Sequence, residues 1–127
     1  MRAVDTNVLI RLATRDDPRQ VAAAEAFVER GAWVSHLVLM ETVWVLSSVY
    51  EIETAGIANA VEVLLNHRDL TLQDGDTIMA ALALFRAKPN VSFSDCLVLE
   101  VARKAGHLPL GTFDRSLGRI DGAESLK

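Results

Sequence analysis

The sequence predicts an α/β protein with a short, mostly parallel sheet flanked by helices. Apolar runs of strand length alternate with longer amphipathic segments, which is typical of a parallel sheet with helical crossovers. Pro is scarce, Gly is scattered and no low-complexity tract divides the chain. Since 127 residues are enough for a sizeable core, we predict one domain over residues 1–127.

The first quarter of the chain is predicted to form a strand and two helices. Residues 2–5 are predicted to form a short buried strand with the carboxylate of Asp5 at its end, and residues 7–14 continue as a short helix. A pair of aspartates followed by Pro18 is typical of a helix start, and Gly31 is a suitable residue to end that second helix.

Trp33 and Val34 indicate a second strand, and Ser35 is expected to open a helix that runs to about Tyr50. Residues 54–66 show the clearest amphipathic spacing, so a further helix is predicted there.

Residues 70–72 indicate a third strand, after which Asp76 is expected to cap a helix that ends before Pro89. Another helix is predicted over residues 92–104 and ends at Gly106.

The last predicted elements are a strand over residues 108–113 and a helical turn over residues 114–117. Asp5 and Asp114 would then both follow strands. Because ligands of open parallel sheets bind at the carboxyl ends of the strands, both residues are placed where a site is expected.

Four acidic residues are candidates for a metal site: Asp5, Glu41, Asp95 and Asp114. A cluster of carboxylates would need a hard divalent cation to neutralise it. Asp5, Asp95 and Asp114 also lie near predicted helix starts, where Asp is a preferred capping residue, and Asp95 fits position N3 of a capping box. Glu41 interrupts an apolar helix that the pattern predicts to be buried, so a buried ion pair or an exposed helix edge is its alternative explanation.

The charge and cysteine content limit the class of protein. The formal net charge is -4, so the chain lacks the basic excess of a non-specific nucleic-acid binder. No apolar run is long enough to cross a membrane, and no secretory signal is expected. Cys96 is the only cysteine and is expected to be a small buried hydrophobe, which suits a cytoplasmic protein.

Four segments, in order along the chain, resemble the motifs of the PIN domain family, and specifically its VapC-like toxin branch. The first motif is Val4-Asp5-Thr6-Asn7, followed by Val34-Ser35 with Met40-Glu41, Ser94-Asp95-Cys96, and Thr112-Phe113-Asp114. The resemblance covers essentially the whole chain and implies a PIN-like α/β/α sandwich.

The resemblance implies a site in which Asp5, Glu41, Asp95 and Asp114 bind Mg²⁺ or Mn²⁺, with Asp5 and Asp95 as the most direct ligands. Asn7 and Thr112 would support this site. The all-oxygen donor set suits Mg²⁺ better than zinc. The implied activity is endonucleolytic cleavage of RNA by metal-activated water, in a homodimeric toxin inhibited by a VapB-like antitoxin.

Two other functions compete with this one. A phosphatase of the haloacid dehalogenase type also begins with an Asp after a strand, but it needs a second Asp where this chain has Asn7. A non-catalytic PIN-like module would bind RNA or protein without cleaving it. There are two pairs of arginines spaced by four residues, Arg11 with Arg15 and Arg115 with Arg119, and they would grip phosphates if they flanked the acidic site.

Overall fold

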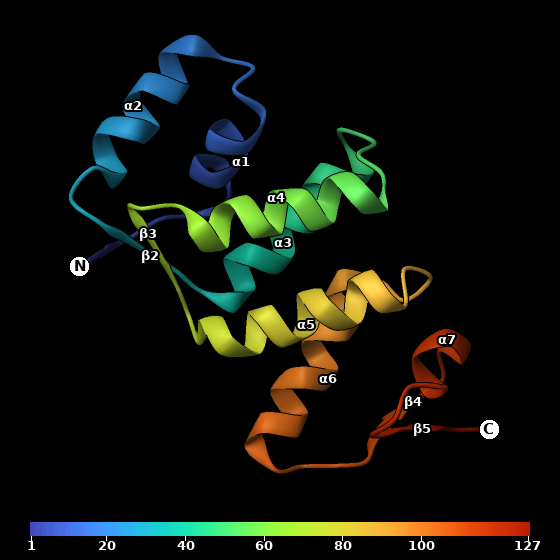
Figure 1. Ribbon diagram of the computed structural model, residues 1–127. Coiled ribbons are helices and arrows are strands. Elements are labelled where there is room, and N and C mark those ends of the chain that lie inside the picture. The colour runs from blue at the N-terminus through green and yellow to red at the C-terminus, as the bar shows by residue number, and fades with distance from the viewer. The chain divides into compact units, whose positions relative to one another are not determined.

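Seven helices and five short strands make up the chain in the computed structural model, which describes all 127 residues (Figure 1). Their bounds are β1 Arg2–Ala3, α1 Thr6–Thr14, α2 Pro18–Val28, β2 Ala32–Val34, α3 His36–Ser48, α4 Thr54–Asn66, β3 Leu70–Leu72, α5 Gly75–Ala87, α6 Phe93–Ala105, β4 Leu110–Thr112, α7 Arg115–Gly118 and β5 Ala123–Ser125. The chain divides into two compact units: unit 1 is Met1–Gly75 and unit 2 is Asp76–Lys127.

Unit 1 is built on a three-stranded parallel sheet in the order β1-β2-β3. Arg2 pairs with Ala32 across β1 and β2, and Trp33 pairs with Thr71 across β2 and β3. Because all three strands run the same way, the residues that follow them lie at one edge of the sheet. Asp5 follows β1 at this edge.

The helices of unit 1 form the two crossover connections of its sheet. Helices α1 and α2 connect β1 to β2, and α3 and α4 connect β2 to β3. Helix α1 packs against α2 and α3, while α4 packs against α3 and β3. Each helix turns an apolar stripe inward, as shown by the buried Leu9 and Ile10 of α1 and the buried Val61 and Leu64 of α4. This packing sets α1, which follows Asp5, directly beside α3, which carries Glu41.

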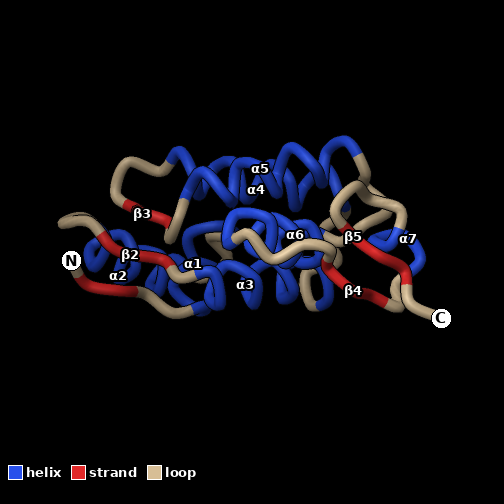
Figure 2. Tube along the Cα trace, turned by 90° about the horizontal axis from the view of Figure 1, so that it is seen from below, coloured by secondary structure: helices blue, strands red, loops and turns tan.

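Unit 2 consists of two long helices followed by a small sheet. The rings of Phe85 in α5 and Phe93 in α6 meet edge to face, with 5.9 Å between their centroids. Strands β4 and β5 pair in parallel, and α7, which connects them, packs on both. Figure 2 shows these two strands side by side near the C-terminus. Asp114 lies between β4 and α7.

A guanidinium joins α6 to the loop before β5. The Arg103 side chain donates to the Asp121 carbonyl oxygen at 2.7 Å and pairs with Glu100 on its own helix. Gly122 follows with a φ of +96°, and a Cβ there would lie 3.0 Å from the Arg103 nitrogens. The positive φ favours glycine at this turn, and any other side chain would also displace the guanidinium by a few tenths of an ångström.

The prediction of an α/β fold with short parallel strands is confirmed, and the predicted bounds of α4 and β3 agree with the structure. The five strands are grouped in two sheets, of three and two strands. Strand β5 was not predicted. The prediction that the first strand is buried is wrong, because β1 is an edge strand and both of its residues are exposed. Asp76 does not cap α5, because that helix already begins at Gly75 and Asp76 lies in its first turn. Helix α2 ends at Val28, so Gly31 follows the C-cap Glu29 by two residues.

Candidate metal site and its surroundings

Asp5 lies at the carboxyl end of β1 and is the N-cap of α1. Its Oδ1 accepts a long hydrogen bond of 3.4 Å from the Val8 backbone N–H. The side chain is exposed and forms no ion pair with an arginine or lysine. The capping bond occupies one carboxylate oxygen and leaves the other without a protein partner.

Glu41 lies on an exposed edge of α3, which was one of the two alternatives to a catalytic role. Residues one turn before and after it, Leu37 and Trp44, are 80% and 62% exposed. The prediction that this helix is buried on nearly every side is therefore wrong. The Glu41 carboxylate is held by a short hydrogen bond from the hydroxyl of Thr6, which is buried at the start of α1. This bond links the residue next to Asp5 to Glu41, although 35 positions separate them.

Asp95 is half-buried in the first turn of α6. Its backbone N–H donates to the hydroxyl of Ser92, the N-cap, at 3.1 Å. The structure thus shows one of the two bonds of a capping box, the one that uses the Asp95 backbone. The Asp95 carboxylate itself has neither a hydrogen-bond donor nor an ion-pair partner among the protein groups. A carboxylate at this place is favoured by the helix dipole and remains available for a ligand.

Asp114 is the N-cap of α7, and Thr112 orders the turn that leads to it. The Asp114 Oδ1 accepts from the Leu117 N–H at 2.8 Å, and the Asp114 N–H donates to the Thr112 hydroxyl at 3.0 Å. Thr112 therefore forms its hydrogen bond with the backbone of Asp114. The second oxygen of the Asp114 carboxylate has no protein partner.

Asn7, which the resemblance gives a supporting role, is exposed in the first turn of α1. It forms one wall of a hollow of about 480 Å³ between α1 and α2, with Val8, Gln20 and Phe27 among the other lining residues. The role of Asn7 in the site stays a prediction.

The four candidate carboxylates share two properties. None is in an ion pair with arginine or lysine, and each keeps at least one oxygen without a protein donor. Anionic oxygens left unneutralised in this way fit the ligand preference of a hard divalent cation. Asp5 and Glu41 belong to unit 1, whereas Asp95 and Asp114 belong to unit 2. Neither unit by itself groups three His, Cys, Asp or Glu side chains around one point.

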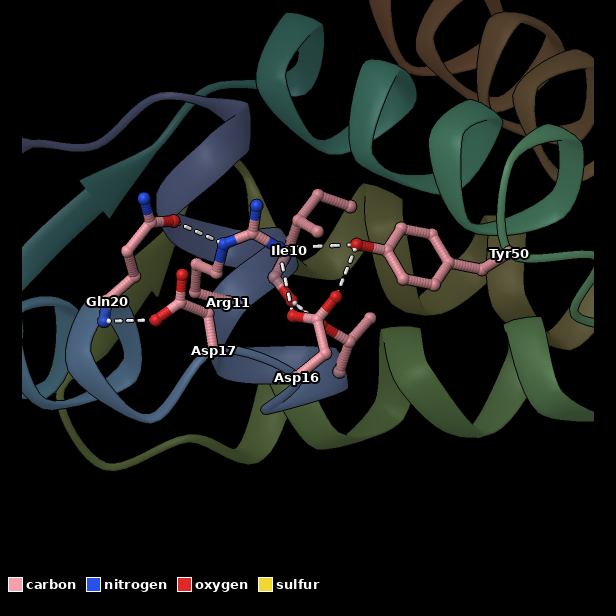
Figure 3. A network of polar contacts seen from close by, with 7 residues as sticks. Ile10, Arg11, Asp16, Asp17, Gln20 and Tyr50 are labelled. Atoms are coloured by element: carbon pink, nitrogen blue, oxygen red, sulfur yellow. Dashed lines mark hydrogen bonds and ion pairs between the residues drawn. The ribbon is translucent and has the colours of Figure 1, made fainter.

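The Arg11 side chain is engaged in a polar network of unit 1 (Figure 3). Its guanidinium donates to Asp16 at 2.9 Å, to the Tyr50 hydroxyl at 3.2 Å and to the Gln20 side chain. Tyr50 donates in turn to the other oxygen of Asp16 at 2.9 Å. Arg11 therefore ties α1 to the end of α3, which contradicts the hypothesis that it is free to grip phosphates.

The network shifts the pKa values of Arg11 and Asp16. The hydrogen bond with Tyr50 is the main cause of a raised pKa for Arg11, and the Asp16 charge adds to it. Hydrogen bonds from Thr14 and then Tyr50 lower the pKa of Asp16, with a further contribution from the Arg11 charge. Both groups remain ionised over the neutral range.

The Cys96 thiol is buried beside Asp95 in α6. Burial, followed by the charges of Asp95 and Glu100, raises its pKa to about 11. At neutral pH the thiol is protonated and is not a nucleophile. The expectation that Cys96 is a small buried hydrophobe is confirmed.

No stabilising role was predicted from the sequence for two residues of this region, Thr6 and Tyr50. Thr6 follows Asp5 directly, but nothing in the sequence links it to a glutamate 35 positions away. Tyr50 was taken as part of an apolar helix stripe, and its hydroxyl gave no sign of the bond with Asp16.

Comparison with known protein families places these features in context. The family model of the PIN domain matches residues 2–123, which is nearly the whole chain. The protein therefore belongs to the PIN domain family, as the motifs predicted. Comparisons with curated proteins and with solved structures gave no match. PIN domains are generally nucleases and typically use divalent metals, so the chain has a nuclease-type function. None of its helices is both long and apolar enough to span a membrane.

Proposed function

We propose that this protein is a Mg²⁺- or Mn²⁺-dependent endoribonuclease, the toxin of a VapBC-type toxin–antitoxin system that acts in the cytoplasm. The observation that carries the proposal is the match of the PIN domain model to residues 2–123, and the state of the four candidate acids is compatible with it. In a chain of the PIN domain family, Asp5, Glu41, Asp95 and Asp114 all lack a cationic partner. No arginine or lysine therefore competes with a divalent cation for these carboxylate oxygens.

In the proposed site, Asp5 and Asp95 hold the cation, while Glu41 and Asp114 orient the attacking water or hold a second ion. A bound Mg²⁺ supplies Lewis acidity toward the scissile phosphate and lowers the pKa of water. The protein's own contribution is positioning. Thr6 holds the Glu41 carboxylate, and Thr112 orders the backbone of Asp114. The Glu41 carboxylate and the turn that carries Asp114 are thereby ordered before the substrate binds, which lowers the reorganisation needed for reaction.

We propose an apolar groove of unit 1 as the docking site of the antitoxin. This groove of about 490 Å³ runs between the ends of α1 and α3 and the face of α4, lined by Leu12, Leu46, Ile52 and Val63 among others. Glu51 and Glu53 flank Ile52. These charges favour an apolar partner segment with basic flanks. If the product of a neighbouring small reading frame binds the Val63→Arg variant as tightly as the wild type, this docking site is wrong.

The proposed homodimer is supported by the exposed apolar side chains of α3. Leu37 and Trp44 lie two turns apart on one face of that helix with Glu41 between them, so the proposed interface would border the acidic site. Exposed large apolar groups on one face are typical of association surfaces. Sedimentation at increasing concentration should show a dimer that Trp44→Asp weakens, and a concentration-independent monomer would contradict this part of the proposal.

Cleavage of a mixed pool of single-stranded RNA tests the proposed activity. The wild type should cut internally with Mg²⁺ or Mn²⁺ and lose activity with a chelator, because the metal supplies the Lewis acid. Asp5→Ala should remove cleavage, whereas Asp121→Ala, at an exposed acid outside the site, should retain it. RNA that is bound but never cut with either metal would favour the alternative, a non-catalytic PIN-like RNA- or protein-binding module.

A further inference from the structure

The charges of the chain are divided unevenly between its units. Unit 1 carries 11 acidic and 6 basic residues, whereas unit 2 carries 6 acidic and 7 basic residues. Several arginines of unit 1 also form ion pairs with acidic residues, such as Arg11 with Asp16 and Arg15 with Glu25. A polyanionic substrate is therefore repelled less by unit 2.

The most exposed aromatic side chain of the molecule belongs to unit 2. Phe113 is 75% exposed and stands between Thr112 and Asp114 in the sequence. One exposed phenylalanine needs no explanation on its own. The position of Phe113 does need an explanation, because this residue adjoins one of the four candidate acids and contributes no core packing.

The backbone on both sides of Phe113 is held by hydrogen bonds. The Thr112 hydroxyl accepts from the Asp114 N–H, and the Asp114 carboxylate accepts from the Leu117 N–H. Leu117 is buried and anchors the short helix that follows. The aromatic ring is thus presented from an ordered turn, so a ligand that stacks on it pays little of the entropy of ordering the backbone.

Two guanidiniums accompany this ring in the next few residues. Arg115 and Arg119 are exposed, and neither has an acidic partner. They are spaced by four residues across α7 and its C-cap, so they lie on neighbouring parts of the same surface. Unpaired guanidiniums are well suited to phosphate oxygens.

We propose that Phe113, Arg115 and Arg119 form a contact surface for single-stranded RNA, which we name the 113–119 surface. A base stacks on the Phe113 ring, and the two arginines bind backbone phosphates on either side of it. Aromatic stacking with phosphate contacts is the usual chemistry of single-strand binding. The proposal rests on the proposed ribonuclease function. It adds that the strand is gripped beside Asp114, so these residues position the substrate and take no part in the chemistry.

Binding of a fluorescein-labelled single-stranded RNA to the full chain, followed by anisotropy with Ca²⁺ in place of Mg²⁺, tests the stacking contact. Phe113→Ala and Phe113→Leu should each weaken binding by about 5- to 100-fold, the loss of one stacked base, while Phe113→Trp should bind like the wild type. Met79→Ala is the matched control, because it removes a 59% exposed apolar side chain of unit 2 that has no ring. Equal binding by wild type and Phe113→Leu would overturn the proposal.

The salt dependence of the same binding tests the arginines. Arg115→Gln and Arg119→Gln should each weaken binding for every sequence and reduce the slope of log K against log salt by about 0.7, the value for one phosphate of a single strand. Arg19→Gln, at an exposed arginine of unit 1 without an ion-pair partner, should leave the slope unchanged. Equal slopes for the wild type and both unit 2 variants would overturn the phosphate contacts.

Two further outcomes separate this inference from the proposed function. If the wild type cleaves RNA but Phe113→Ala leaves both KM and affinity unchanged, the 113–119 surface is wrong and the ribonuclease stands. If the wild type binds RNA through Phe113 without cleaving it, the 113–119 surface stands and the proposed enzyme activity does not.

A changed sedimentation coefficient of Phe113→Ala with unchanged RNA affinity would assign the surface to a protein partner and overturn the proposal.

Discussion

A carboxylate in the first turn of a helix serves either the helix or a ligand, and Asp95 and Asp76 allow the two roles to be separated. Both lie in the first turn of a long helix, in α6 and α5 respectively. Asp95→Asn should abolish RNA cleavage, because it removes a proposed metal ligand, whereas Asp76→Asn should leave cleavage unchanged. Both variants lose a similar favourable interaction with the helix dipole, about 0.3–1 kcal/mol.

Thermal unfolding in the absence of metal completes this comparison. Since clustered carboxylates repel each other without a cation, Asp95→Asn should be at least as stable as the wild type, while Asp76→Asn is slightly less stable. An Asp95→Asn variant that is markedly destabilised and still cleaves RNA would show that this acid only supports the helix.

Asp16 gives the molecule a pH-dependent contribution to stability. Its pKa in the folded state is lowered from 3.8 by bonds from Thr14 and Tyr50. A lowered pKa means that the folded state favours the carboxylate. The contribution is therefore present above the unfolded pKa and is lost as the pH falls through the folded value.

Denaturant unfolding between pH 6 and pH 2 measures this contribution of Asp16. The difference in unfolding free energy between the wild type and Asp16→Asn should shrink as the pH falls below about 4. Tyr50→Phe, which removes one of the donors to Asp16, should flatten the same difference curve. A difference that is constant over the whole range would show that the Asp16 charge is not linked to folding.

At the scale of elements, two polar contacts hold α1 against α3. Thr6 bonds to Glu41 near the start of α1, and Arg11 bonds to Tyr50 near its end. Together with the apolar packing of the two helices, they hold α1, which Asp5 caps, against α3, which carries Glu41. The Arg11 contact therefore supports half of the candidate site from a distance.

Hydrogen exchange of the backbone amides tests this coupling of the helices. Tyr50→Phe should speed exchange at the end of α1 and at the end of α3 together, by about 5- to 100-fold, as expected for the loss of the two hydrogen bonds of its hydroxyl, with Arg11 and Asp16. Ser47→Ala is the control, because the Ser47 hydroxyl bonds only within α3. Faster exchange confined to α3 in both variants would contradict a link to α1.

The elements that could be predicted from the sequence are those with a strong local signal. Helix α4 has both an apolar stripe and clear ends, and its predicted bounds agree with the structure. Strand β5 was missed because Ala-Glu-Ser has little strand preference, and its pairing with β4 is a tertiary contact. The start of α5 was misplaced because Asp76 suits both a cap and a first turn.

At the scale of the whole molecule, the sequence predicted the family and the α/β class, because four motifs occur in order over almost the entire chain. The immediate surroundings of the acids were less accessible. The bond between Thr6 and Glu41 joins residues far apart in sequence, and no periodic pattern reports such a pair. The proposal that all four acids bind one cation involves both units, and it predicts that the cation couples them.

A thermal-unfolding cycle with Mg²⁺ measures this coupling most directly. The wild type, Asp5→Asn, Asp95→Asn and the double variant are unfolded with and without Mg²⁺. At about 100 times its Kd, Mg²⁺ should stabilise the wild type by about 2.7 kcal/mol. Because one cation needs ligands from both units, each single variant should lose most of this stabilisation and the double variant little more. Stabilisation by Mg²⁺ that survives both substitutions, or losses from the two that simply add, would contradict a shared metal site.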